Sequence, residues 1–370
     1  MLQAISADTA GSTLHSYSSP VTDSAADRWH TDLLGSGYAA LSLELGDDPD
    51  GESPIAATLI RRERQDGDPV AVGAVLYVHG LSDYFFHTEL ADAFARRGYQ
   101  FYALDLRKCG RSRRPGQTGH HITDLRRYDL ELEWAMSRIA VDLPGTPVIA
   151  AAHSTGGLIV SWWAHRRRLN TGSAGTTSRR ATSPHTTSQP LTGLVLNSPF
   201  LDLQGSALLR TVGTEALRAI AAAAPHRLVP RQSLSAYGDS LHISRRGEWD
   251  YDLELKPLGG FGVTFGFINA VRRAQASLHR GWDTGTTSLV LRSDASALGG
   301  DGTAIDRADA VLDVRQIAQW AGCLGGRLTS IPVPGARHDV FLSQAAARAT
   351  AYAELDEWLR VNQSRLQQPA

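Results

Sequence analysis

Short apolar runs alternate with helix-like segments along most of this chain, and this alternation constrains the fold more than any other feature. Residues 72–78 have the sequence VGAVLYV, an uninterrupted apolar run typical of a parallel strand buried on both faces. A segment with one apolar helical face follows, ends near Gly98, and leads into the next apolar run at 101–104. Repeated strand–helix units predict the α/β class, with a mostly parallel, doubly wound sheet covered by helices on both faces.

Further strand-like runs lie before and after these two. They are residues 39–45, 56–62, 148–152, 191–196, 288–291 and 328–333. Two stretches interrupt the pattern: residues 170–189 are of low complexity, and residues 199–284 combine helical pieces, glycine-rich turns and aromatic side chains. The expected organisation is therefore a loose N-terminal segment (1–35), an α/β core (36–198 and 285–370) and a helical cap inserted at 199–284.

Composition excludes several classes of function. Of 370 residues, 42% are hydrophobic and 20% are charged, and the formal net charge of −1 provides no field that would attract nucleic acid. No apolar run approaches the roughly 18 residues that cross a bilayer, and the N-terminus lacks the pattern of a secretion signal. The two cysteines, Cys109 and Cys323, suit a reducing compartment. We expect a soluble cytoplasmic protein without a transmembrane segment or a nucleic-acid partner.

The strongest chemical signal is the segment Ala-His-Ser-Thr-Gly-Gly at 152–157, between the run 148–152 and a predicted helix. A nucleophile elbow needs this context, because its tight turn leaves room only for small residues two before and two after the serine. Ala152 and Gly156 meet that requirement. The turn would lift the Ser154 hydroxyl above the sheet, beside a helix N-terminus that stabilises negative charge. We predict that Ser154 is a nucleophile; the alternative is that it only caps the helix.

An oxyanion hole would complete such a site. A tetrahedral acyl intermediate needs two backbone N–H donors, one from the residue after the nucleophile and one from the loop after an earlier strand. Thr155 follows Ser154, and the segment His-Gly-Leu-Ser at 79–82 follows the run 72–78. We therefore expect the N–H groups of Thr155 and Leu81 to be the two donors.

The general base is expected last in the chain, on a loop after the final strand. Of 13 histidines, only His338 has this placement, because it follows the run 328–333 and a glycine-containing loop. His153 adjoins the nucleophile and is expected to point away from the site as a structural residue. His120 and His121 precede a predicted helix and are expected to face solvent.

A carboxylate must orient the histidine and stabilise its protonated form. The aspartates after the run 288–291 are Asp294, Asp301, Asp306, Asp309 and Asp313. Asp294 lies closest to the end of the strand. Asp309 lies just before the next helix, and the glycine-rich segment 295–305 could form an inserted loop that returns it to the strand end. Both aspartates remain candidates on these grounds.

Six segments together resemble a known family. They are VLYVHGLSDY (75–84), FYALDLRKCGRS (101–112), AHSTGG (152–157), LVLNSPFLDL (194–203), ADAVLDV (308–314) and GARHDVFLS (335–343). Over roughly 56–360, except 170–189 and most of the cap, the chain resembles the serine-aminopeptidase-like branch of the α/β-hydrolases, which includes monoacylglycerol lipases and lysophospholipases. The resemblance implies the α/β-hydrolase fold and favours Asp309 as the acid. The loop inserted ahead of Asp309 departs from the family pattern and keeps Asp294 as the alternative.

The expected reaction is carboxylic-ester hydrolysis through an acyl-serine, on a small-molecule or lipid-like ester, with neither metal nor organic cofactor. Three other functions use the same residues or fold: a serine-dependent acyltransferase, an aminopeptidase and a non-catalytic binding protein. An aminopeptidase needs acidic groups in the cap that hold an amine, for which the candidates are Glu248, Asp250, Asp252 and Glu254. Serine at 154 excludes the dehalogenases and epoxide hydrolases that use an aspartate nucleophile. The sequence indicates no oligomeric state.

Overall fold

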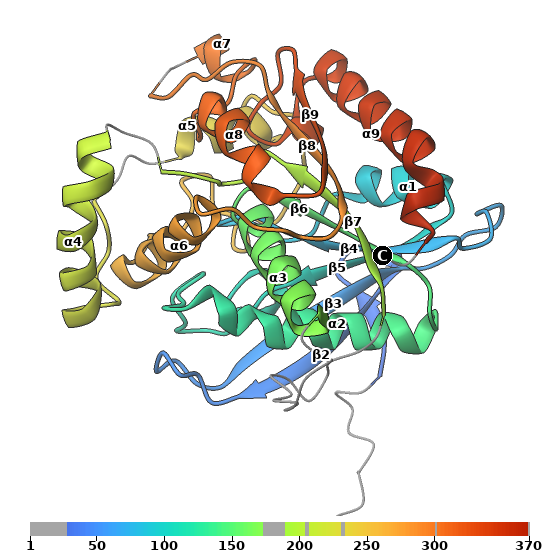
Figure 1. Cartoon of the computed structure of the whole chain (residues 1–370), viewed down its shortest axis with the longest axis horizontal. Coiled ribbons are helices and arrows are strands. Elements are labelled where there is room, and N and C mark those ends of the chain that lie inside the picture. Colours follow the sequence, from blue (N-terminus) through green and yellow to red (C-terminus); the bar gives the residue numbers. More distant parts are fainter. Residues whose placement is uncertain (1–27, 173–188, 204–206, 231–233, 300–301, 369–370) are drawn as a thin grey trace, which may run out of the picture.

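A computed structural model describes residues 28–172, 189–203, 207–230, 234–299 and 302–368 (Figure 1). Its strands are β1 (His30–Asp32), β2 (Gly35–Gly46), β3 (Ile55–Arg62), β4 (Gly73–Val78), β5 (Tyr99–Asp105), β6 (Val148–His153), β7 (Leu191–Asn197), β8 (Thr287–Ser293) and β9 (Arg327–Val333). Its α-helices are α1 (Thr88–Arg96), α2 (Asp129–Asp142), α3 (Thr155–Gly172), α4 (Ala207–Ala223), α5 (Ser235–Leu241), α6 (Phe265–Leu278), α7 (Gly302–Ile305), α8 (Val314–Ala321) and α9 (Ala345–Leu366).

The described strands form one sheet in the order β1-β2-β3-β5-β4-β6-β7-β8-β9. β1, β2 and β3 are antiparallel to their neighbours, whereas the six strands from β5 to β9 run parallel. Parallel strands need crossover connections, and helices between them supply these. The expected mostly parallel sheet with crossover helices is therefore confirmed.

Alternate residues of the central strands supply two cores, one on each face of the sheet. On β4, Leu76 and Val78 pack in a cluster with α2, α3 and α8, whereas Val75 and Tyr77 pack with α1 and α9. Figure 1 shows α9 and α1 together on one side of the sheet and α3 on the other. Burial on both faces explains why these strands are apolar at every position rather than at every second one.

One sequence expectation differs from the structure at the N-terminal end. Residues 1–27 of the predicted loose segment lie outside the described residues, and 30–32 form the paired strand β1. Asp32 holds this strand in place, because its carboxylate accepts hydrogen bonds from Arg111 at 2.6 and 2.8 Å. Of the predicted low-complexity stretch 170–189, residues 173–188 lie outside the described residues, and residues 170–172 form the end of α3.

The chain between β7 and β8 carries α4, α5 and α6, where the sequence predicts a cap. In Figure 1, α4 and α6 lie side by side at one edge of the molecule. α6 also packs against α3, because its buried residues Phe267, Ala270 and Val271 belong to the same core cluster. Within the described residues, no helix combines the length and the apolar character that crossing a membrane requires.

Candidate active site

Ser154 occupies the sharp turn between β6 and α3. Its φ of 53° is in the left-handed region, which a non-glycine residue adopts only when surrounding contacts hold it there. The N–H of Ser154 donates to the Asn197 carbonyl at 2.9 Å, which ties the turn to β7. A Cβ at Gly156 would lie 2.6 and 2.4 Å from the carbonyl oxygens of Val78 and His79, so no larger residue fits there. The structure therefore has the strained strand–turn–helix geometry expected around Ser154.

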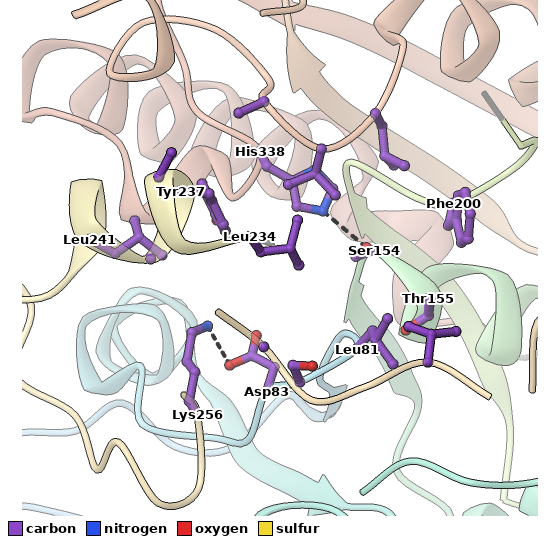
Figure 2. Close-up of a pocket in the computed structure, with 18 of the residues that line it drawn as sticks. Leu81, Asp83, Ser154, Thr155, Phe200, Leu234, Tyr237, Leu241, Lys256 and His338 are labelled. Atoms are coloured by element: carbon purple, nitrogen blue, oxygen red, sulfur yellow. Dashed lines mark hydrogen bonds and ion pairs between the residues drawn. The ribbon is translucent and has the colours of Figure 1, made fainter. Parts of the chain in front are cut away.

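Three side chains from distant parts of the sequence meet at this turn. Ser154 Oγ lies 3.0 Å from His338 Nε2, and His338 Nδ1 lies 2.9 Å from Asp309 Oδ2. A carboxylate only accepts, so Nδ1 carries the hydrogen and Nε2 is left to accept from the serine hydroxyl. The structure thus joins Ser154, His338 and Asp309 in one chain of hydrogen bonds, and all three are buried. Figure 2 shows the contact between Ser154 and His338.

The loop inserted after β8 returns Asp309 to the end of that strand. The Asp309 N–H donates to the Ala295 carbonyl at 2.9 Å, and the Ala297 N–H donates to the Asp309 carbonyl at 2.8 Å. The other carboxylate oxygen of Asp309 accepts from the N–H groups of Val311 and Leu312. We refer to the pairing of 295–297 with Asp309 as the neck of the loop.

Asp294 has a different partner. Its carboxylate accepts from the Gly335 N–H at 3.0 Å, in the loop that leads to His338. The side chain is exposed, and the structure does not bring it to the imidazole. Of the two candidate acids, Asp309 is therefore the one hydrogen-bonded to His338.

A cavity of about 920 Å³ opens beside Ser154 and His338. Most of its walls are apolar and come from the segment between β7 and β8, with Phe200, Leu234, Leu241 and Phe267 among them. Ala297, Leu298 and Gly299 of the inserted loop form a further part of the wall. In Figure 2, Leu234 and Tyr237 lie on the same side of the space as His338, and the Tyr237 and His338 rings are 5.8 Å apart. The size and apolar lining are typical of a pocket for a small apolar ligand.

The two expected oxyanion donors lie at the same cavity. Leu81 and Thr155 both line it, and Figure 2 shows them on the Ser154 side. The chain before Leu81 runs directly against Ser154, because a Cβ at Gly80 would lie 3.1 Å from the Ser154 Cβ. Among the described residues, no protein group accepts a hydrogen bond from the Leu81 N–H, so this donor is available to the cavity.

One side of the cavity holds a buried ion pair that the sequence analysis missed. Lys256 Nζ donates to Asp83 Oδ1 at 2.6 Å, and both side chains are buried. Burial alone would raise the pKa of Asp83, but the Lys256 ammonium reverses this and holds the pKa well below its usual range. Asp83 directly follows the segment 79–82, so its place near the cavity could be predicted from the sequence. No feature of the sequence around Lys256 indicates that its partner is Asp83.

His153 does not point away from the site, and that expectation is wrong. Its ring lies 4.8 Å from the His338 ring, centroid to centroid, and it lines the cavity. Its Nδ1 is 3.4 Å from Asp83 and 3.8 Å from Asp339, two carboxylates contributed by different loops. The residues next to His153 in the sequence do not indicate these contacts, because Asp83 and Asp339 come from distant parts of the chain.

His120 and His121 are also buried rather than solvent-facing. His120 Nε2 accepts from the Ser82 N–H at 2.8 Å, and His121 Nδ1 lies 2.8 Å from Thr264 Oγ1. The residues that cover them, around 82 and 264, come from other parts of the sequence. The expected exposure is wrong because the segment between β7 and β8 folds back over this loop.

The segment between β7 and β8 contacts three successive residues of the loop after β4. The Phe261 N–H donates to Ser82 Oγ at 2.8 Å, and the Asp252 N–H donates to the Tyr84 hydroxyl at 2.8 Å. Lys256 donates a hydrogen bond to Asp83, between these two contacts. Residues 82, 83 and 84 therefore each accept one hydrogen bond from the segment 252–261. The cap segment and the loop that carries Leu81 are therefore joined at the cavity.

The acidic residues considered for an amine site lie elsewhere. Glu248, Asp250, Asp252 and Glu254 are exposed, and none lines the cavity. Across the described residues, no group of three or more His, Cys, Asp and Glu side chains is arranged to hold a metal ion.

Comparisons with solved structures define the class of the fold. The chain superposes on the monoglyceride lipase of Saccharomyces cerevisiae with a TM-score of 0.59 and 16% identity, over 86% of this chain and 94% of that one. For the monoacylglycerol lipase of Paleococcus ferrophilus the values are 0.54 and 17%, over 79% and 96%. For a thermostable carboxyl esterase of Bacillus coagulans they are 0.52 and 14%, over 88% and 98%. The fold is that of the α/β-hydrolases.

The sequence itself identifies the family. Residues 69–341 match the family described as serine aminopeptidase, S33. The chain belongs to this family, within the α/β-hydrolases. A search of curated protein sequences finds no match to the chain.

Proposed function

We propose that the protein is a serine hydrolase that cleaves carboxylic esters with an apolar acyl chain, as a monoacylglycerol lipase or lysophospholipase does. The observation that carries this proposal is the hydrogen-bonded chain Ser154–His338–Asp309 at the wall of a largely apolar cavity. The names of the superposed structures, two monoacylglycerol lipases and a carboxyl esterase, agree with it. Both cysteines, Cys109 and Cys323, are free, which supports a reducing compartment such as the cytoplasm.

In the proposed mechanism, His338 Nε2 takes the proton from Ser154 Oγ as this oxygen attacks the ester carbonyl. Asp309 holds the imidazole in the required tautomer and stabilises the imidazolium that forms. The N–H groups of Leu81 and Thr155 stabilise the oxyanion. The alcohol leaves with the proton from His338, and a water molecule activated by the same nitrogen then releases the acid and restores Ser154.

The charges at the cavity favour esters over peptides with a free N-terminus. An aminopeptidase site needs a carboxylate that is free to pair with the ammonium group of the substrate. Asp83 lines the cavity, but Lys256 already neutralises it. The exposed acidic residues of the cap do not line the cavity. An acyltransferase would use the same catalytic groups, so the products must be identified to separate it from a hydrolase.

The direct test is hydrolysis of p-nitrophenyl esters from two to sixteen carbons by the wild type and by Ser154→Ala. The variant should lose on the order of 10³-fold or more in kcat, because only oxyanion stabilisation and binding remain. Ser161→Ala is the matched control: this serine is buried in α3, lies outside the cavity and should leave kcat unchanged. Mass spectrometry after a fluorophosphonate reaction should locate the adduct on Ser154.

Product analysis completes the experiment. Incubation with a monoacylglycerol or a lysophospholipid should release free fatty acid in the wild type. Transfer of the acyl group to an added alcohol in place of water would assign an acyltransferase. A wild type that is inert towards all these esters, with Ser154 unlabelled, would contradict the proposal and favour a binding protein.

A further inference from the structure

We propose that His79 and His120 are positioning residues that fix the peptide groups on either side of Leu81, so that the Leu81 N–H is aimed at the oxyanion. The inference rests on the proposed function and deepens it, because it assigns a role in the reaction to two histidines outside the triad. Hydrogen-bond geometry determines the tautomer of each ring, and the tautomer determines what each ring holds.

His79 holds the peptide group that contains the donor itself. The Leu106 N–H donates to His79 Nε2 at 3.1 Å, so this nitrogen carries no hydrogen and Nδ1 carries one. Nδ1 lies 2.8 Å from the Gly80 carbonyl oxygen and therefore donates to it. The Gly80 C=O and the Leu81 N–H belong to one planar peptide group and point in opposite directions. Holding the carbonyl towards His79 directs the N–H away from it.

His120 holds the next peptide group. The Ser82 N–H donates to His120 Nε2 at 2.8 Å, so Nδ1 again carries the hydrogen, and it faces Cys109 Sγ at 3.1 Å. Burial raises the pKa of the Cys109 thiol well above its usual value, so the S–H is kept and donates to the Arg107 carbonyl at 3.3 Å. The sulfur is thereby left as the acceptor for His120, and this arrangement fixes the ring.

The backbone of this loop needs such restraint. Ser82 has a φ of 55° and His120 a φ of 62°, both in the left-handed region that costs energy for residues other than glycine. The loop also has little space, since Gly80 abuts both His153 and Ser154. Both histidines are nearly fully buried, with exposed fractions of 1% and 5%. Hydrogen bonds made in such surroundings hold their partners in one orientation.

The expected effect is on the rate of the chemical step. Loss of one oxyanion donor lowers kcat by about 10²- to 10³-fold in enzymes of this kind. A donor that is present but misdirected should lose part of this, about 10- to 100-fold. KM should change little, because the interaction strengthens only when the oxyanion forms.

Amide side chains allow the two nitrogens of each ring to be tested separately. The amide of asparagine overlies Nδ1 of histidine, and that of glutamine overlies Nε2. His79→Asn can still donate to the Gly80 carbonyl, whereas His79→Gln loses that bond and keeps an acceptor for Leu106. His120→Gln keeps an acceptor for the Ser82 N–H, whereas His120→Asn does not. We therefore expect the kcat of His79→Asn to exceed that of His79→Gln by at least tenfold. At position 120 the order is reversed, and the kcat of His120→Gln should exceed that of His120→Asn by at least tenfold.

The opposite preference for asparagine and glutamine at the two positions distinguishes positioning of the Leu81 N–H from a general loss of protein stability. The readouts are kcat and KM with a p-nitrophenyl ester, the inhibition constant of a trifluoromethyl ketone that forms an oxyanion on Ser154, and the free energy of unfolding in urea. The inhibition constant should rise in His79→Gln and His120→Asn in proportion to the fall in kcat. Equal kcat for Asn and Gln at each position, or kcat that follows only the unfolding free energy, would overturn the proposal.

An independent measurement separates this inference from the proposed function. Nitrogen-15 NMR of the histidine-labelled wild-type protein, assigned with the four variants, reports which nitrogen of each ring carries hydrogen. Hydrogen at Nδ1 of both rings is the expected result, and hydrogen at Nε2 of either ring would contradict the proposed geometry whether or not the protein hydrolyses esters. An inert wild type with both Nδ1–H tautomers would contradict ester hydrolysis but would agree with the proposed hydrogen bonds of His79 and His120 to the loop that carries Leu81.

Discussion

Asp309 and Asp294 follow the same strand, and their surroundings give them different roles. Asp309 is buried, accepts from His338 and receives two backbone N–H groups from Val311 and Leu312. Asp294 is exposed and accepts from the Gly335 N–H. A carboxylate held in this way by backbone donors keeps one oxygen directed at the imidazole.

At the scale of a residue, Asp309→Asn should lower kcat on the order of 10⁴-fold, because an amide can favour the wrong tautomer of His338. Asp294→Asn should leave kcat within about twofold, since its side chain takes no part in the hydrogen-bond chain and surface changes have small effects. Rates with a p-nitrophenyl ester measure both. The assignment of the acid would be wrong if the two variants changed places.

Residues of the candidate site differ in how far the sequence could predict them. Ser154 and His338 were predicted because small neighbours and chain order mark their positions locally. Predictions for His153 and His120 were wrong, because the carboxylates, thiol and peptide groups around them come from loops far away in the sequence. Local sequence indicates where the chain turns, but it does not show which distant segment covers the turn.

At the scale of secondary structure, the elbow depends on contact between α3 and β4. Gly156 brings the first turn of α3 against the end of β4, and an added Cβ would lie 2.6 and 2.4 Å from the carbonyl oxygens of Val78 and His79, closer than non-bonded atoms approach. Backbone atoms cannot rotate aside as a side chain can. The position of Ser154 therefore depends on residue 156 having only a hydrogen atom in place of a side chain.

We expect Gly156→Ala to move the start of α3 away from β4, at a cost of about 1–3 kcal/mol in the free energy of unfolding. The kcat should fall as well, because Ser154 and Thr155 move with the helix. Gly322→Ala is the control: a Cβ there meets open space, and the backbone φ of −61° suits alanine. Urea unfolding and ester hydrolysis measure the two effects, and equal behaviour of the two variants would argue against the packing explanation.

Strands were predicted more accurately than helix starts. Apolar runs locate β4, β6 and β7 to within one residue, since strands buried on both faces must be apolar throughout. Thr88 is a residue type that commonly precedes a helix as its N-cap, but here it is the first residue of α1, and His87 occupies the N-cap position. The aromatic surroundings of His87, including Trp249 of the cap segment, place the chain there. Contacts between distant segments thus decide where the helix begins.

At the scale of the whole molecule, the segment between β7 and β8 buries titratable groups of the core. His87 is buried next to Trp249, and this burial lowers its pKa from 6.5 to about 4. In the unfolded chain the same histidine takes up a proton at its ordinary pKa. Between pH 4 and 6.5 the unfolded state therefore binds more protons, and stability must fall as the pH falls.

The free energy of unfolding should accordingly decrease from pH 7 to pH 4, with a contribution from His87 of up to about 3 kcal/mol. His87→Gln does not titrate and should show a shallower decrease over that range. His30→Gln, at an exposed position, should follow the wild type. Urea unfolding at half-unit pH steps measures the slopes; the same slope in His87→Gln and the wild type would contradict the assignment of this acid sensitivity to His87.

The neck that pairs 295–297 with Asp309 has a consequence for how such an enzyme can diversify. Hydrogen bonds between 295–297 and Asp309 join the two ends of the loop. The residues between these ends can therefore increase or decrease in number without changing the position of Asp309. Yet Ala297, Leu298 and Gly299 form part of the cavity wall. If the protein is the proposed hydrolase, evolution can therefore change its choice of substrate at this loop while Asp309 keeps its place beside His338, and an engineer can exchange the loop in the same way.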